Sequence, residues 1–158
     1  MQLFNNASAL RTVLYVEDDE FSVLLMRSLF ERRPDLRLQV ATGCAEALHC
    51  VQAQPLALLL LDLRLPDGHG CELLPRLRAQ PGLRDLPALA VTAEYLPALD
   101  LHGFDELWPK PLQLLQVLDR LDHWLPLHRV QVQGPVPPPA AVSSRQAGGG
   151  PPVGMLMC

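Results

Sequence analysis

The sequence contains no long apolar run. Its longest wholly apolar stretch is Leu56–Leu61, which is much shorter than the roughly 20 residues that a transmembrane helix needs. The amino-terminal segment, MQLFNNASAL, lacks a basic region followed by a long apolar one, so it does not match a secretory signal. We therefore expect neither a membrane span nor export.

Positive charge is scarce, and lysine is almost absent. The 158 residues carry a formal net charge of −4, and the isoelectric point is about 5.7. Neither value favours binding to nucleic acid or to an anionic membrane surface, because both attract basic patches. Lysine and arginine together number 13, yet Lys110 is the one lysine, placed between two prolines. Its position therefore calls for an explanation that composition does not supply.

The cysteines form no recognisable metal or disulfide motif. The sequence has no C-x-x-C spacing and no zinc-type pairing of cysteine with histidine. We interpret the thiols as buried or free in a reducing compartment, which indicates a cytoplasmic protein. The four cysteines are Cys44, Cys50, Cys71 and Cys158.

Composition divides the chain into three parts. Residues 1–10 form an N-terminal extension, residues 11–126 carry regular apolar patterns, and residues 127–158 are rich in proline and glycine. The last part exceeds the roughly 25–30% of proline and glycine at which low complexity becomes the default interpretation. It also lacks a periodic apolar face that would offset the entropy of ordering. We therefore predict one folded domain followed by a disordered tail.

Short apolar runs alternate with segments of helical spacing. The runs predict five strands, at residues 12–16, 36–40, 56–62, 87–92 and 105–109. The spacing predicts helices over about 20–33, 45–51 and 71–79, and a last helix that starts after Pro111. Asp19 is expected to cap the first helix. The predicted core positions are Phe21, Leu24, Leu25, Ser28 and Leu29 in the first helix, and Leu112, Leu115, Leu118, Leu121 and Leu125 in the last.

The third apolar run, LALLLLD, shows no alternation with polar residues. A strand that is apolar on both sides is covered on both faces, which is typical of a parallel sheet with helices above and below it. Five strands alternating with helices therefore predict an α/β fold with a doubly wound, five-stranded parallel sheet. In such folds, ligands bind outside the carboxyl ends of the strands.

Polar residues follow the predicted strands at that edge. Glu17 and Asp18 follow the first strand, Asp62 ends the third, Thr92 ends the fourth and Lys110 follows the fifth. Because parallel strands share one carboxyl edge, we expect these side chains to converge. Clustered carboxylates repel one another unless a cation intervenes, and their oxygen atoms suit Mg²⁺, which also binds phosphate. A carboxylate nucleophile, a divalent metal, a lysine and a hydroxyl donor are the parts needed to transfer a phosphoryl group onto an aspartate.

Four motifs in this order, LYVEDDE, LDLRLPDGHG, AVTAE and PKP, resemble the receiver domain of two-component response regulators. The resemblance covers roughly residues 11–125 and implies a CheY-like, flavodoxin-like sheet of strand order 2-1-3-4-5. It also implies that Asp62 accepts a phosphoryl group from a sensor histidine kinase or a histidine phosphotransfer protein. Such a domain is a Mg²⁺-dependent conformational switch, and it catalyses only its own phosphorylation and dephosphorylation.

The resemblance assigns roles to individual residues. Thr92 would bind a phosphoryl oxygen, and Lys110 would contact it. Asp18 would bind the metal directly, and Glu17 would bind it through water. The implied metal ligands are Glu17, Asp18, Asp62 and the backbone carbonyl of Arg64.

The sequence departs from the family pattern in two places. The family usually has an aromatic residue three positions before the lysine, where this chain has Leu107. The segment between Thr92 and Lys110 is also short, which predicts a fourth helix about one turn shorter than usual. Arg64 and Glu94 occupy positions that tune the phosphoryl lifetime in the family, and their opposite charges could pair at the mouth of the site.

Two other functions stay open beside the phosphorylated switch. One is a pseudo-receiver that binds proteins independently of phosphorylation, which Leu107 and the short fourth helix suggest. The other is a flavin- or nucleotide-binding enzyme, which VEDDE disfavours because a phosphate cradle needs glycines at that loop. The sequence does not name the downstream protein, and the leucine-rich last helix leaves a homodimer possible.

Overall fold

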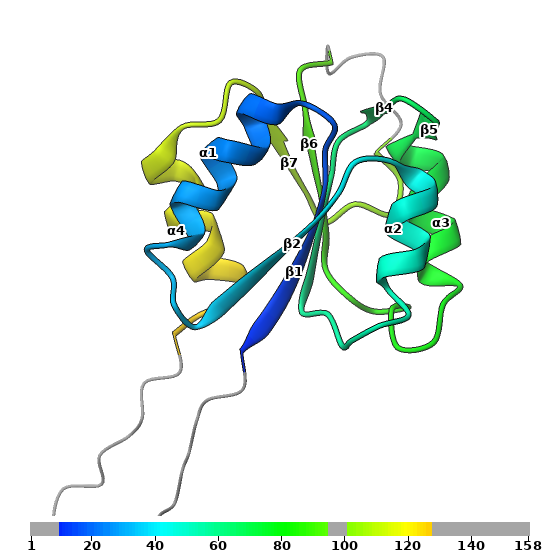
Figure 1. The fold of residues 1–158 in the computed structure, drawn as a ribbon, viewed down its shortest axis with the longest axis horizontal. Coiled ribbons are helices and arrows are strands. Elements are labelled where there is room, and N and C mark those ends of the chain that lie inside the picture. The colour runs from blue at the N-terminus through cyan, green and yellow to red at the C-terminus, as the bar shows by residue number, and fades with distance from the viewer. Residues whose placement is uncertain (1–9, 95–100, 128–158) are drawn as a thin grey trace, which may run out of the picture. The chain divides into compact units, whose positions relative to one another are not determined.

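The computed structural model describes residues 10–94 and 101–127. Apart from a short hairpin and the step between the last two strands, strands and helices alternate along this part of the chain (Figure 1). The strands of the main sheet are β1 (Arg11–Val16), β2 (Leu36–Ala41), β3 (Leu58–Leu61), β6 (Ala88–Thr92) and β7 (Glu106–Pro109). The helices are α1 (Glu20–Phe30), α2 (Cys44–Cys50), α3 (Gly70–Arg78) and α4 (Leu114–Trp124).

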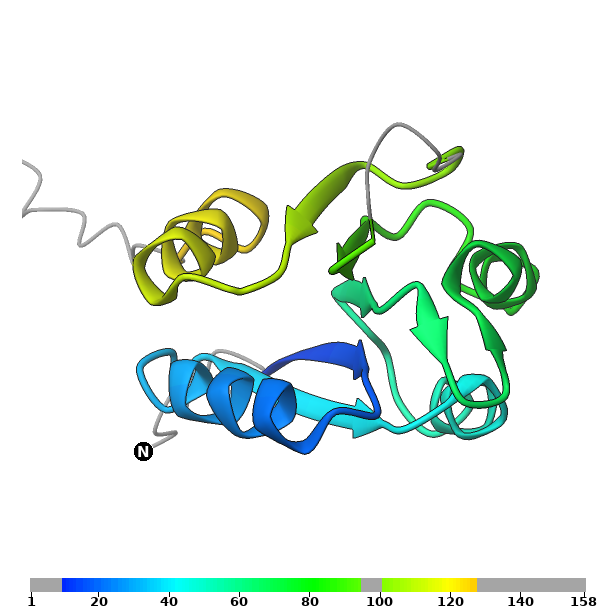
Figure 2. The same ribbon diagram turned by 90° about the horizontal axis from the view of Figure 1, so that it is seen from above.

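The main sheet is parallel, with the order β2-β1-β3-β6-β7. Helices α1 and α4 cover one face of it, and α2 and α3 cover the other (Figure 2). This arrangement confirms the predicted doubly wound α/β fold and its strand order, with β6 and β7 as the fourth and fifth strands of the sheet. The short antiparallel hairpin of β4 (Arg64–Leu65) and β5 (Gly68–His69) was not predicted.

Strand β3 lies at the centre of the sheet and of the core. All four of its leucines are fully buried. Leu58 and Leu60 belong to the core under α1 and α4, whereas Leu59 and Leu61 belong to the core under α2 and α3. Because successive side chains of a strand point to opposite faces, an uninterrupted apolar run is required to fill both cores.

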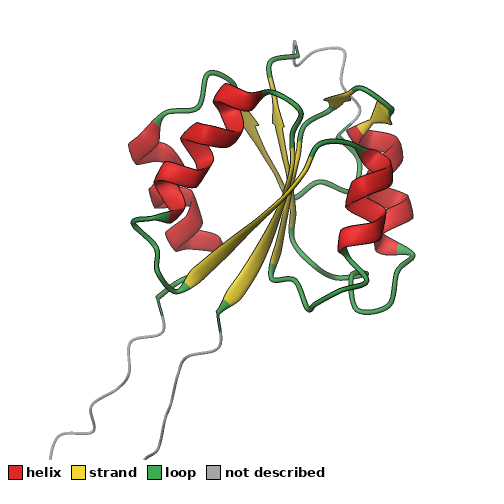
Figure 3. Ribbon diagram, viewed as in Figure 1, coloured by secondary structure: helices red, strands yellow, loops and turns green. Residues whose placement is uncertain are grey.

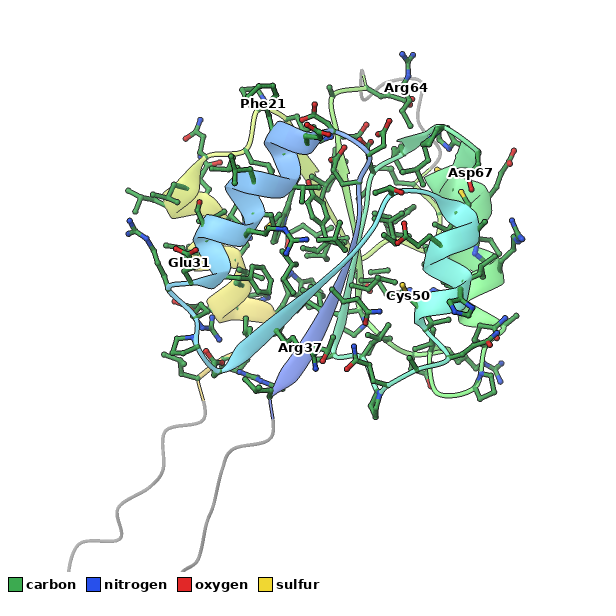
Figure 4. All side chains as sticks on the ribbon, viewed as in Figure 1. Phe21, Glu31, Arg37, Cys50, Arg64 and Asp67 are labelled. Atoms are coloured by element: carbon green, nitrogen blue, oxygen red, sulfur yellow. The ribbon has the colours of Figure 1, made fainter. Side chains whose placement is uncertain are left out.

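The predicted core face of α1 is partly wrong. Phe21 is 82% exposed and Leu24 is 65% exposed, whereas Met26, Leu29 and Phe30 are buried. Figure 4 shows Phe21 near the start of α1. The helix is apolar around most of its circumference, so the sequence contains two overlapping apolar stripes, and only packing against the sheet selects one of them. Asp19 does cap this helix, since its Oδ2 accepts a hydrogen bond from the Ser22 N–H at 2.8 Å.

The last helix also differs from the prediction. It begins at Leu114 rather than directly after Pro111, because the backbone is still extended at the N-cap residue Gln113. The predicted core positions Leu121 and Leu125 are buried, whereas Leu115 is 75% exposed and Val117, which was not predicted, is buried.

Three predictions lie outside the described residues. They are the N-terminal extension over residues 1–9, most of the shortened fourth helix, of which residues 95–100 are not described, and the tail over residues 128–158. In the part of the chain that the structure describes, no helix is long and apolar enough to cross a membrane.

A buried arginine joins the turn after α1 to the end of α4. The Arg33 guanidinium is 2.8 Å from Asp35 and 2.5 Å from Asp122, and it donates to the carbonyl of Leu125 at 2.7 Å. Arg33 is only 4% exposed. The hydrogen bonds from Arg33 hold the pKa of Asp35 well below its usual range. This cluster ties together segments that are far apart in the sequence.

We predict that Arg33→Met lowers the free energy of unfolding by about 1–3 kcal/mol at pH 7, because it removes the hydrogen bonds that the buried guanidinium donates to Asp35 and to the Leu125 carbonyl, while Asp35 keeps its ion pair with Arg11. The exposed Arg37, which extends from β2, provides the matched control Arg37→Met, which should change stability by less than about 0.5 kcal/mol. Urea denaturation measures both values.

The same contact predicts a pH dependence. Because the Asp35 pKa is lower in the folded protein than in the unfolded chain, its contribution is complete above a pH of about 4 and is lost as the pH falls below that value. Arg33→Met should therefore lose less stability than the unchanged protein between about pH 5 and pH 2. Equal losses would contradict this role of Asp35.

Candidate functional site

The polar residues predicted at the strand ends do lie together. Glu17 directly follows β1, Asp62 directly follows β3, Thr92 ends β6 and Lys110 directly follows β7. The carboxyl ends of these parallel strands lie at one edge of the sheet (Figure 3). Further ladder hydrogen bonds fix the backbone of three of these residues. The Glu17 N–H donates to Ala41, the Asp62 N–H to Val16 and the Lys110 N–H to Thr92, at 2.8–2.9 Å. The positions of these side chains are therefore set by the sheet itself.

Lys110 bridges two carboxylates. Its Nζ lies 2.5 Å from Glu17 Oε2 and 2.6 Å from Asp62 Oδ2. Burial lowers the pKa of Lys110, but the hydrogen bonds to Asp62 and Glu17 outweigh burial and raise the pKa above its usual value. Lys110 is therefore a fixed positive charge in the cluster. Its slender stem lets a compact ammonium reach between two acids, which the broader guanidinium of arginine does not reproduce.

Glu17 is a fully buried carboxylate with several donors around it. Its Oε1 accepts a hydrogen bond from the Asp19 N–H at 3.1 Å, and its Oε2 accepts one from the Tyr15 hydroxyl at 2.9 Å in addition to Lys110. Burial raises the pKa of Glu17 above its usual value, and the hydrogen bonds from Lys110 and Asp19 oppose that shift. These donors offset part of the cost of placing a carboxylate in the protein interior.

Glu17, Asp18 and Asp62 can each offer an oxygen atom within 4.8 Å of the others. Asp18 is exposed at the rim of this group, while the other two are buried. A set of carboxylate oxygens with open solvent on one side fits a hard divalent cation that keeps some of its water. The chemistry of the group is therefore compatible with a metal site.

The second oxygen of Asp62 and the hydroxyl of Thr92 bond to backbone groups. Asp62 Oδ1 accepts a hydrogen bond from the Arg64 N–H at 3.1 Å, and Thr92 Oγ1 accepts one from the Glu94 N–H at 3.1 Å. Gly70, at the start of α3, passes close behind Asp62, where a Cβ atom would lie 2.5 Å from the Asp62 carbonyl oxygen. Only glycine allows this close approach of the backbone.

An ion pair lies at the mouth of the site. Arg64 Nε is 3.0 Å from Glu94 Oε1, and the arginine projects from the carboxyl edge of the sheet, as Figure 4 shows. His69 Nε2 lies 3.6 Å from the other oxygen of Glu94. These contacts connect the β4–β5 hairpin to the end of β6. The opposite charges of Arg64 and Glu94, which the sequence indicates could pair, thus form an ion pair.

Leu107 and Trp108 lie in the fifth strand of the sheet, near the end that carries Lys110. Trp108 is buried in the same core cluster as Val117 and Leu121, so it packs against α4. Leu107 is half-buried, and its position in the strand places it on the opposite face. The position where the family usually has an aromatic residue is therefore occupied by a smaller aliphatic side chain.

Sequence reasoning missed two residues beside this site. Tyr15 was assigned only to a strand, and nothing in the apolar run distinguished its hydroxyl as a partner of Glu17. Asp67 lies in the motif LDLRLPDGHG, and its two carboxylate oxygens accept hydrogen bonds from the N–H groups of Cys44 and Ala45 at 2.7 and 2.9 Å, at the start of α2. The Pro-Asp-Gly sequence at residues 66–68 indicates a turn, but it does not indicate this partner.

Comparison with known proteins agrees with this arrangement. The family model of the response regulator receiver domain matches residues 13–120. A 14.6 kDa uncharacterized protein encoded near sodA1 in Leptolyngbya boryana is 32% identical over 110 residues, which cover 67% of this chain and 83% of that protein. The polar-differentiation response regulator DivK of Brucella ovis is 34% identical over 83 residues, which cover 52% of this chain and 67% of DivK.

Solved structures that resemble this chain are also receiver domains. The non-phosphorylated HemR receiver domain from Leptospira biflexa is 34% identical, with a TM-score of 0.60 over 75% of this chain and 97% of that one. The receiver domain of a sensor histidine kinase from Pseudomonas aeruginosa, with a magnesium ion coordinated in its active-site cleft, is 25% identical, with a TM-score of 0.66 over 73% of this chain and 98% of that one. The match of the family model to most of the chain shows that this protein belongs to the response regulator receiver domain family.

Proposed function

We propose that the domain accepts a phosphoryl group on Asp62 and acts as a switch in two-component signal transduction. The observation that carries the proposal is the position of Asp62 between a lysine and an acidic group. One carboxylate oxygen lies 2.6 Å from Lys110 Nζ, and Glu17 and Asp18 offer further oxygens within 4.8 Å. A nucleophilic carboxylate, a cation and a set of oxygen ligands therefore meet at one strand end.

The proposed reaction forms one bond and breaks one. A carboxylate oxygen of Asp62 attacks the phosphorus atom of a phosphohistidine on a sensor kinase or phosphotransfer protein. The phosphorus–nitrogen bond breaks, and the imidazole leaves with its electron pair. Lys110 and the Thr92 hydroxyl would then stabilise the oxygens of the transferred group.

Mg²⁺ is the cofactor in this proposal. Its ligands would be Glu17, Asp18, Asp62 and the backbone carbonyl of Arg64. When bound, the ion offsets the negative charge of the phosphoryl oxygens and of the carboxylates. The support from this chain is that its acidic group offers oxygen ligands in a partly open arrangement.

A phosphorylation-independent protein-interaction module is the second candidate. Leu107 favours it, because the family usually has an aromatic residue at this position, and a smaller leucine does not replace that residue in the conformational switch. In both cases, the downstream partner is a protein.

A homodimer through α4 belongs to the proposal as well, since Leu115 presents an exposed apolar side chain on that helix.

The first test is phosphorylation by a small phosphodonor. Incubation of the full chain with Mg²⁺ and acetyl phosphate should add one phosphoryl group, detected by intact mass, and Asp62→Asn should abolish the adduct. The exposed Asp85, in the loop before β6, provides the matched control Asp85→Asn, which should keep it. Absence of an adduct in the unchanged protein would favour the interaction module.

The second test concerns the ion pair at the mouth of the site. We propose that Arg64 and Glu94 limit the access of water to phosphorylated Asp62. Arg64→Ala and Glu94→Ala should each raise the rate constant of dephosphorylation about two- to fivefold, which corresponds to the energy of a largely exposed ion pair. The side chain of Arg84 is exposed and outside this contact, so Arg84→Ala should leave the rate unchanged. Unchanged rates in both site variants would refute the proposed shielding.

A further inference from the structure

Tyr15 is a buried polar residue that points to the site from inside the core. It lies in β1, two residues before Glu17, so the two side chains share one face of the sheet. The residue is fully buried, in the core cluster under α1 and α4. Its hydroxyl donates a hydrogen bond to Glu17 Oε2 at 2.9 Å. A phenylalanine would fill the same space, so packing alone does not account for the hydroxyl.

The oxygen that Tyr15 contacts is also the one that Lys110 contacts. Lys110 Nζ lies 2.5 Å from Glu17 Oε2 and 2.6 Å from Asp62 Oδ2. Burial and the charge of Glu17 both raise the pKa of Tyr15, so its hydroxyl stays protonated and remains a donor. Glu17 Oε2 therefore has two donors, and one of them is shared with Asp62.

We propose that Tyr15 is a positioning residue of the site, whose hydroxyl holds Glu17 in place and leaves Lys110 available to Asp62. The physical reason is the division of one ammonium between two carboxylates. A buried carboxylate attracts every available donor because it has lost its water. If the hydroxyl is removed, Glu17 Oε2 keeps only Lys110, and the lysine shifts toward Glu17 and away from Asp62. The effect on phosphorylation rests on the proposed function, whereas the contact between Tyr15, Glu17 and Lys110 does not.

The single lysine allows a direct test of this contact. In protein labelled with ¹⁵N-lysine, only Lys110 contributes a side-chain signal to the NMR spectrum. Tyr15→Phe, which removes one oxygen atom, should shift the Lys110 Nζ signal. It should also weaken Mg²⁺ binding by about tenfold in calorimetric titration, because residues that orient metal ligands have effects of that size. Neither measurement requires a phosphorylated protein.

The control repeats the substitution in a Glu17→Gln protein, which lacks the negative charge that accepts the hydrogen bond from the Tyr15 hydroxyl. Adding Tyr15→Phe to Glu17→Gln should shift the Lys110 signal by less than half as much as the same change in the unchanged protein. An equal shift in both backgrounds would mean that the hydroxyl acts through packing, and it would overturn the proposal. An unchanged Lys110 signal in Tyr15→Phe alone would overturn it as well.

A second modification keeps the proposal testable if Tyr15→Phe does not fold. Incorporation of 3-fluorotyrosine into a Tyr95→Phe chain places the label at Tyr15 alone and makes its hydroxyl a stronger donor. The Lys110 Nζ signal should then shift relative to that of the Tyr95→Phe protein without the fluorine label. No shift would overturn the proposal.

A phosphorylation assay distinguishes a failure of this inference from a failure of the proposed function, on which part of the inference rests. If acetyl phosphate labels the unchanged protein, Tyr15→Phe should be labelled several-fold more slowly, and an equal rate would overturn the claim about Lys110 and Asp62. If no variant is labelled, the proposed phosphoacceptor function fails. A shifted Lys110 signal would then still support the positioning of Glu17 and Lys110 by Tyr15.

Discussion

The contact of one ammonium with two buried carboxylates is the interaction on which the site depends. Lys110 lies between Glu17 and Asp62, which come from the first and third strands of the sequence. Each carboxylate alone would be costly to bury at the end of a strand, and together they repel each other. The lysine offsets both effects, and it also joins the last strand of the sheet to the central ones. The same three side chains therefore stabilise the fold and form the candidate site.

The sheet gives this contact its geometry. Hydrogen bonds of the ladder extend one residue beyond β1, β3 and β7, so the backbone of each charged residue is fixed before its side chain makes any contact. Burial of β3 on both faces holds the central strand in place, and Gly70 lets α3 begin directly behind Asp62. A site built in this way is preorganised, because its main groups are placed by regular structure rather than by loops.

The hairpin after Asp62 connects the site with the surrounding elements. Arg64 contacts Glu94 at the end of β6, and Asp67 accepts hydrogen bonds from the first turn of α2. Two elements that are distant in the sequence therefore meet the same short hairpin. Asp62 is joined to this hairpin by the hydrogen bond from the Arg64 N–H. The packing of the molecule thus offers routes from the site to its surface.

The sequence by itself determined the fold class and the group of residues at the strand ends. The unbroken run LALLLLD required a strand covered on both faces, and polar residues after each strand had to converge because parallel strands share an edge. The tertiary structure decided what local patterns leave open. Helix α1 carries two apolar stripes, and only the sheet selected the one with Met26 in place of the one with Phe21. The hydrogen bond from Tyr15 to Glu17 and the cluster of Arg33 with Asp122 were equally invisible, since their partners are fixed by side-chain direction or by contacts between distant segments. The periodicity of a sequence indicates which residues can be buried, whereas packing in three dimensions decides which of them are buried and which residues they contact.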